Sequence, residues 1–242
     1  MPSASSFSAD GRIFQVDYAH EAVSRGTLAV GVTGKDCLVF AIEKKTLDKF
    51  EDGQTSQKIT KIEDNIYGVI SGLNADGRVL MNKAILKGQQ YRYDNFQEEM
   101  SAFQIAKDIS KIKQEFTQSG GKRPFGVSCL IGGIDGITEV PSLYLTEPSG
   151  TLAQYMCYAI GKGSKSVIDF FEENYKQNLN DEEIYKLAIQ GILQVHQNPS
   201  SETISLLVLK NNESYYLDND KVGKMVEEYL QTQREETQAI NH

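Results

Sequence analysis

The residue types that most often hold metals or attack substrates are sparse in this sequence. Its three cysteines and three histidines lie far apart along the chain, at Cys37, Cys129, Cys157, His20, His196 and His242. They do not form the clusters that metal sites need. Three widely spaced cysteines inside apolar stretches are typical of small apolar residues in a reducing compartment. We therefore expect no metal, no cofactor, and a location in the cytoplasm and nucleus.

Two short motifs resemble a nucleotide-binding loop and a glycosylation site, but the surrounding sequence supports neither. Gly161-Lys162-Gly163-Ser164 is too short for a nucleotide-binding loop, so we interpret it as a tight turn and helix cap. Asn212-Glu213-Ser214 matches a glycosylation sequon, but nothing in the sequence suggests secretion.

The charge and the apolar content of the sequence indicate which kinds of partner it can bind. The 242 residues include 33 acidic and 25 basic side chains, giving a formal net charge of −8. An acidic chain is a poor candidate for nucleic-acid binding, which depends on cations that neutralise phosphates. The sequence has no apolar run long enough to cross a bilayer and no signal segment at residues 1–7. We expect protein partners, no nucleic acid and no membrane.

Short apolar runs alternate with pairs of helical patterns. We expect hairpins over 27–33 with 37–43, 143–146 with 152–158 and 204–209 with 214–217, and single buried strands over 66–71 and 127–132. Helical spacing follows Asn74, runs from Ile105 to Phe116, and begins at Ser164, at Asn180 and after Asp218. This order predicts an α+β fold in which two stacked antiparallel sheets lie between helical layers.

The domain boundaries follow from the same pattern. Residues 27–230 contain no linker and are expected to form one sandwich domain. Residues 1–26 form a separate N-terminal segment, in which 16–25 have the spacing of a short amphipathic helix. Residues 231–242 are polar, and we expect this C-terminal tail to fray into solvent.

The N-terminal segment carries the most specific motif. Phe7 to Ala19 reads FSADGRIFQVDYA, and it resembles the signature of proteasome α subunits, FSP[DE]GRL[FY]QV[DE]YA. Ala9 stands where the family has proline. Further family motifs follow in order, namely SGLNAD (71–76), GGKRPFG (120–126), EPSG (147–150) and IGKGS (160–164). The resemblance, to the threonine-peptidase family that includes the 20S proteasome subunits, extends from about Phe7 to Tyr229, and its details favour the fourth or third α subtype.

This resemblance implies a fold and a place in an assembly. The fold is the four-layer αββα sandwich of N-terminal-nucleophile hydrolases, preceded by an α-type helix. The assembly is a heteroheptameric α ring stacked on a ring of β subunits, and the implied roles are ring assembly, pore gating and docking of regulatory particles for ubiquitin-dependent protein degradation.

The resemblance also implies site residues. The gate and ring segment comprises Phe7, Asp10, Gly11, Arg12, Asp17, Tyr18, Arg123 and Pro124. A pocket that receives the C-terminal tails of regulatory ATPases or activators comprises Lys58, Gly72, Leu73 and Ile13. Residues 1–6 lack the tyrosine and aspartate with which family tails close the pore, so we expect them to contribute little to the closed gate.

The alternative is a catalytic β-type threonine peptidase. Gly26-Thr27 resembles a processing junction, and Glu43 and Lys58 stand near the positions of the β acid and lysine. However, Thr27 follows a helix rather than a propeptide, so its nitrogen is an amide without a basic lone pair. Glu43 is also one methylene longer than the β aspartate. We expect no catalytic residue; a free-standing binding module is the third possibility.

Overall fold

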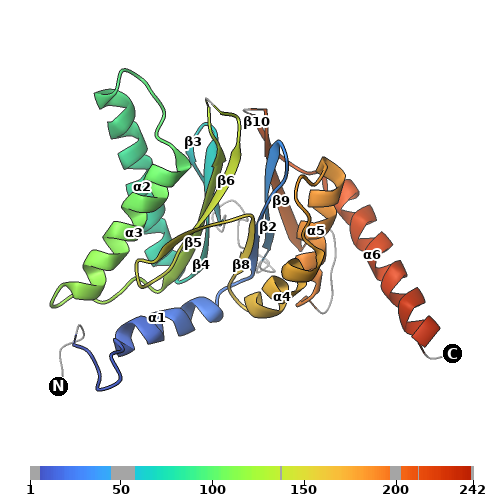
Figure 1. Cartoon of the computed structure of the whole chain (residues 1–242), viewed down its shortest axis with the longest axis horizontal. Coiled ribbons are helices and arrows are strands. Elements are labelled where there is room, and N and C mark those ends of the chain that lie inside the picture. The colour runs from blue at the N-terminus through green and yellow to red at the C-terminus, as the bar shows by residue number, and fades with distance from the viewer. Residues whose placement is uncertain (1–5, 45–57, 137, 197–202, 212, 241–242) are drawn as a thin grey trace, which may run out of the picture.

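The computed structural model describes residues 6–44, 58–136, 138–196, 203–211 and 213–240, with side chains of the last range described to residue 232. Its strands form two antiparallel five-stranded sheets (Figure 1). The first has the order β10-β9-β2-β1-β8, with β1 (Ala29–Thr33), β2 (Cys37–Glu43), β8 (Cys157–Ile160), β9 (Ile204–Lys210) and β10 (Glu213–Tyr216). The second has the order β3-β4-β5-β6-β7, with β3 (Ile59–Glu63), β4 (Ile66–Gly72), β5 (Val127–Ile134), β6 (Pro141–Thr146) and β7 (Leu152–Tyr155).

Helices cover the outer face of each sheet, which confirms the predicted four-layer αββα sandwich. The second sheet is covered by α2 (Asn74–Asp94) and α3 (Ala102–Gln118), and the first by α4 (Ser164–Asn174), α5 (Asp181–Leu193) and α6 (Asn219–Ile240). A further helix, α1 (Phe14–Ser24), lies across one end of the sandwich (Figure 1). None of the described helices is both long and apolar enough to span a membrane.

The alternation of side chains along each strand produces three apolar layers. On β2, Leu38 and Phe40 point between the sheets, whereas Val39 and Ala41 point toward the helices. The inner layer joins the sheets, and each outer layer joins one sheet to its helices. Strands that are buried on both faces read as continuous apolar runs, which is why most of them could be predicted.

The structure differs from the sequence-based expectation in three places. The expected strand 152–158 is two strands, because the chain crosses between sheets at Met156: β7 pairs with β6, and β8 pairs with β1. The edge strand β3 was not predicted, since it is short and irregular near Lys61. The last helix is longer than the apolar spacing up to Leu230 indicated: α6 continues to Ile240, and residues 231–240 include neither glycine nor proline.

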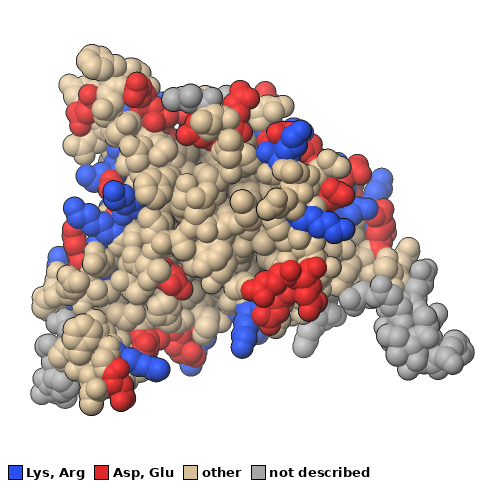
Figure 2. Space-filling view, viewed as in Figure 1, with Lys and Arg blue, Asp and Glu red and all other residues tan. Residues whose placement is uncertain are grey.

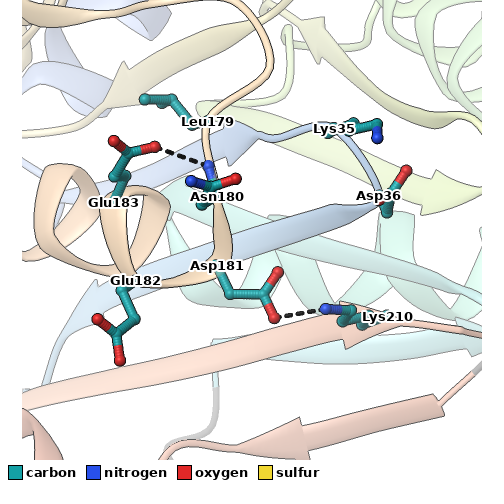
Figure 3. A pocket seen from close by; sticks show the side chains of 8 residues that line it. All are labelled: Lys35, Asp36, Leu179, Asn180, Asp181, Glu182, Glu183 and Lys210. Atoms are coloured by element: carbon teal, nitrogen blue, oxygen red, sulfur yellow. Dashed lines mark hydrogen bonds and ion pairs between the residues drawn. The ribbon is translucent and has the colours of Figure 1, made fainter.

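A depression of about 670 Å³ lies where α5 begins (Figure 3). The main-chain N–H of Asn180 donates to Glu183 Oε2 at 2.8 Å, completing the predicted capping box, and Asp181 pairs with Lys210 of β9. Cys37, at the start of β2, lies close enough to Asp181 to feel its charge. Burial raises the pKa of Cys37 to about 12, and Asp181 adds to the shift. The thiol is therefore protonated at neutral pH, as expected for a structural cysteine.

A lysine is buried between α3 and β6. Lys113 Nζ donates to Thr146 O at 2.8 Å and to Thr146 Oγ1 at 2.9 Å, and the side chain has no solvent exposure. Desolvation lowers the pKa of Lys113, although Cys129 and Glu147 act in the opposite direction. Burying the charged ammonium group of Lys113 therefore lowers the stability of the folded state relative to an exposed lysine.

Replacing both Lys113 and Thr146, as Lys113→Met/Thr146→Val, should remove a pH dependence. With the folded-state pKa of Lys113 below the unfolded value of about 10.4, the unfolded state binds more protons between these two values. The free energy of unfolding of the unmodified chain therefore rises with pH in that window, and that of the double variant should rise less. Urea denaturation at a series of pH values from 7 up to about 10.4 measures the slope for each protein. Equal slopes in the two proteins would contradict a desolvated Lys113.

Candidate functional site

The candidate site is the end of the sandwich that α1 covers. Ala19 and Val23 of α1 are buried against β4 and β5, whereas Phe14 and Tyr18 are exposed on its other face. Their ring centroids lie 6.5 Å apart. The sequence spacing predicted this helix to start two residues later, at Val16. Its two faces mean that α1 is attached to the domain along one side and presents aromatic side chains on the other.

The chain leaves α1 through a close approach of two backbones. The N–H of Gly26 donates to Val23 O, and the N–H of Lys162 donates to Gly26 O, both at 2.8 Å. A Cβ atom on Gly26 would lie 2.3 Å from Ser71 Oγ and 2.4 Å from the nitrogen of Gly72. Ser71 Oγ donates to Thr27 O at 2.8 Å. Glycine at position 26 is therefore required for α1 to enter β1 against the end of β4.

A cavity of about 400 Å³ lies beside this junction. It is lined by Tyr18, Glu21, Ala22, Arg25, Gly26, Gly72 and Leu73. Leu73 is 46% exposed, and Glu21 pairs with Arg25 at 3.0 Å on the rim. The cavity thus combines an apolar wall, accessible backbone and a charged rim. Sequence reasoning did not include Glu21, Ala22, Arg25 or Gly26 in it.

The structure brings together two of the four residues predicted for the tail pocket. Gly72 and Leu73 line the cavity. Lys58 is 9% exposed and precedes β3; because Ile59 lies opposite Val69, Lys58 is at the same end of the sheet as Gly72. Ile13 is the N-cap residue of α1 and does not line the cavity. The pocket of four residues therefore stays a prediction.

The predicted gate residues lie ahead of α1 and on its exposed face. Phe7, Asp10, Gly11 and Arg12 are exposed around a turn in which the N–H of Ser8 donates to Arg12 O at 2.8 Å. Asp17 and Tyr18 are exposed on α1. Residues 1–5, on which the expected weak contribution to gate closure depends, lie outside the described part of the chain.

The loop that contains Arg123 and Pro124 is attached to its own domain. Arg123 Nη1 and Nη2 donate to the two carboxylate oxygens of Asp76 at 2.6 and 2.8 Å, and the N–H of Gly126 donates to Asp76 Oδ2 at 3.0 Å. The hydrogen bond from Arg123 holds the pKa of Asp76 below its usual range despite burial. These contacts tie the loop to the first turn of α2 and support a local role; a contact with a neighbouring subunit stays a prediction.

Arg123→Ala should destabilise the domain modestly. It leaves the carboxylate of Asp76, whose side chain is 12% exposed, with fewer donors, but the guanidinium is 61% exposed and solvent screens the pair. We expect a loss of about 1 kcal/mol at pH 7. The loss should shrink as pH falls toward the folded pKa of Asp76, which lies below about 3.9, because protonation ends the attraction.

Denaturation at pH values from 7 to 3 measures this loss of unfolding free energy, and Lys165→Ala at an exposed position is the control. A loss that does not change with pH would contradict the pairing.

The residues that resembled a threonine-protease site are not arranged as one. Thr27 Oγ1 is buried and has no hydrogen-bond partner among the described residues, and its nitrogen is a peptide nitrogen that follows Gly26. The carboxylate of Glu43 instead lies 3.1 Å from Nδ1 of His196. Thr27 Oγ1 thus has no base within hydrogen-bonding distance among the described residues, and Glu43 lies against His196 instead.

Comparison with known proteins agrees with this geometry. The sequence matches the family described as "Proteasome subunit" over residues 23–209, and the N-terminal signature of A-type proteasome subunits over residues 3–22. Proteasome subunit alpha type-7 from Dictyostelium discoideum is 43% identical over 221 residues, which are 91% of this chain and 87% of that protein. Its counterpart from Trypanosoma brucei brucei is 39% identical over 233 residues, 96% of this chain and 93% of that protein.

A third relative, Proteasome subunit alpha type-7-A from Arabidopsis thaliana, is 40% identical over 224 residues, 92% of this chain and 88% of that protein. These relatives are named alpha type-7, rather than by the fourth or third subtype that the motifs favoured. The α1 helix and the N-terminal signature both point to an α-type subunit. The chain belongs to the proteasome subunit family, as an α-type subunit that is structural and not catalytic.

Proposed function

We propose that this chain is the counterpart of the relatives named alpha type-7 and occupies one position of a heteroheptameric α ring stacked on a β ring. The observation that carries the proposal is α1, which covers the end of the sandwich with one face and exposes Phe14 and Tyr18 on the other. An exposed aromatic face next to a gate-type turn suits contacts with ring neighbours and with the pore. The location would be the cytoplasm and nucleus, where proteins are degraded through ubiquitin.

The same end of the molecule would receive regulatory particles. The cavity beside Gly72 and Leu73 opens next to α1, and Lys58 lies at the same end of the sheet. Backbone at Gly72 together with a nearby ammonium suits the terminal carboxylate of an ATPase or activator tail. Ile13, one helix away on the α1 segment, would complete the pocket across a subunit boundary.

Native mass spectrometry of the complex purified through a tag on this chain tests the assignment. We expect a multi-subunit particle that contains six other α-type subunits and a set of β-type subunits. Recovery of the chain only as a monomer of 27.0 kDa would contradict the proposal and favour a free-standing module.

A further inference from the structure

A groove of about 460 Å³ lies in the helical layer that covers the first sheet. Three helices each contribute one apolar side chain to it, namely Phe170 of α4, Ile189 of α5 and Met225 of α6. Ile189 is 1% exposed, whereas Phe170 and Met225 are partly buried against the same apolar layer. A groove of this volume is in the range of sites that take a small ligand, so it suits a short segment rather than the face of a whole subunit.

Side-chain amides surround the apolar part of the groove. Asn174 Nδ2 donates to Phe170 O, and Gln194 Nε2 donates to the hydroxyl of Tyr229, both at 2.9 Å. The amide oxygens of Asn174 and Gln194 accept no hydrogen bond from a described residue, and the side chain of Gln190 forms none with one. These groups can therefore accept from and donate to the main chain of a bound peptide.

The rim of the groove is acidic. Glu173 of α4 and Glu228 of α6 line it, and Asp169 and Glu172 are exposed on α4. Glu228 pairs with Lys186 at 3.3 Å, whereas the three acids of α4 form no ion pair with a described residue. Figure 2 shows Asp and Glu gathered where Figure 1 has α4. The carboxylates of α4 are thus available to a cationic ligand.

The whole helical layer has the same sign of charge. The helices α4, α5 and α6 together carry eleven Asp or Glu and five Lys or Arg, whereas α2 and α3 carry four and seven. The field of an acidic layer attracts cations and repels anions. The groove therefore favours a basic ligand over an acidic one.

We propose that this groove binds a short arginine-containing peptide segment of another protein, with apolar side chains on Phe170, Ile189 and Met225 and arginines paired with Glu173 and Glu228. Arginine suits the site better than lysine, because its planar guanidinium donates to two carboxylate oxygens at once. Methionine adapts to apolar groups of different shapes.

The groove differs from the proposed pocket for regulatory tails in place and in charge. None of the residues that line it lines the cavity beside α1. Its acidic rim would also repel the terminal carboxylate of such a tail. The two sites would therefore take different ligands.

Fluorescence anisotropy with three labelled peptides tests the ligand chemistry. The first peptide has arginines on both sides of two leucines, the second has glutamate in place of each arginine, and the third has serine in place of each leucine. We expect the first to bind, the second not to bind, and the third to bind about tenfold more weakly than the first, because it lacks the apolar anchors. No binding of the first peptide, equal binding of the glutamate peptide, or equal binding of the serine peptide would overturn the proposal.

Two double substitutions locate the binding site. Glu173→Gln/Glu228→Gln removes two carboxylates from the groove, and Glu98→Gln/Glu115→Gln removes the same charge at exposed positions outside it as a matched control. The groove variant should bind the arginine peptide about fivefold more weakly than the control, because it loses two exposed ion pairs. Equal affinities would show that only the overall charge attracts the peptide and would overturn the proposal.

The outcome can be separated from that of the proposed function. The assays use the full chain whether or not it is assembled, and thermal melting of each variant shows that the domain is folded. A failure of the peptide assays would leave the place of the chain in a ring untouched, and native mass spectrometry reports on that place separately.

Discussion

Gly72→Ala is expected to lower the free energy of unfolding by about 3–5 kcal/mol, a large part of the stability of an ordinary domain. Gly72 has a φ of +118°, which L-residues rarely adopt. A Cβ atom there would lie 2.2 Å from the carbonyl oxygen of Gly126. That oxygen accepts a hydrogen bond from the N–H of Leu73 at 2.9 Å, so it cannot move without breaking the end of the β4–β5 pair.

Gly120→Ala is the matched control. No atom lies within 4 Å of a Cβ built on Gly120, and its φ is not in the left-handed region. We expect this control to change the unfolding free energy by less than about 0.5 kcal/mol. Chemical denaturation of both purified variants gives the comparison. Similar midpoints for Gly72→Ala and Gly120→Ala would show that the end of β4 can relax, and the close approach at the candidate site would lose its physical basis.

Lys58→Met is expected to weaken the binding of a regulatory tail peptide to the assembled ring by roughly tenfold to a hundredfold. A charge-assisted hydrogen bond contributes roughly 1.5–3 kcal/mol, and each 1.4 kcal/mol is about a factor of ten in affinity. Lys58 is 9% exposed as a residue, so a carboxylate that reached it would be partly shielded from water, and the contact would be stronger than at a surface lysine. Methionine keeps the apolar stem and removes the charge, which limits the effect on folding.

A double-mutant cycle with the peptide isolates the carboxylate contact. The tail is used with a free C-terminus and with an amidated one, and fluorescence anisotropy is measured on rings that contain either the unmodified chain or its Lys58→Met variant. Lys58→Met should weaken the binding of the peptide with a free C-terminus and have little effect on the binding of the amidated peptide. A loss of the same size for both peptides would mean that Lys58 supports the local structure instead of binding the carboxylate. The tail must be one shown to enter this pocket in the unmodified ring.

The sequence predicted the fold well because most strands are buried on both faces. Runs such as Val127–Gly132 are apolar at nearly every position, and the capping box at Asn180 gives the start of α5. The crossing at Met156 could not be predicted, since a strand that changes sheets keeps the same composition on both sides of the break. The edge strand β3 alternates too briefly to give a periodic signal.

The candidate site was predicted less completely, because its contacts are long-range. Gly72 and Leu73 could be named from the motif they belong to, but the approach of Gly26 to Ser71 depends on how α1 meets β4. Likewise, Arg123 was expected at a subunit boundary, and only the fold shows that it binds Asp76, 47 residues away along the chain. Pairing between side chains on different elements leaves no periodic trace in a single sequence.

The most direct test of the α-type, non-catalytic assignment is the intact mass of this chain isolated from the native particle. The junction at Gly26-Thr27 lies at the end of α1, and this helix is packed on β4 and β5 of its own domain. We therefore expect a chain that retains the helix, with a mass near 27.0 kDa. A chain that begins at Thr27, with the preceding residues removed, would contradict it, because the threonine would then have the free amine that a nucleophile of this kind requires.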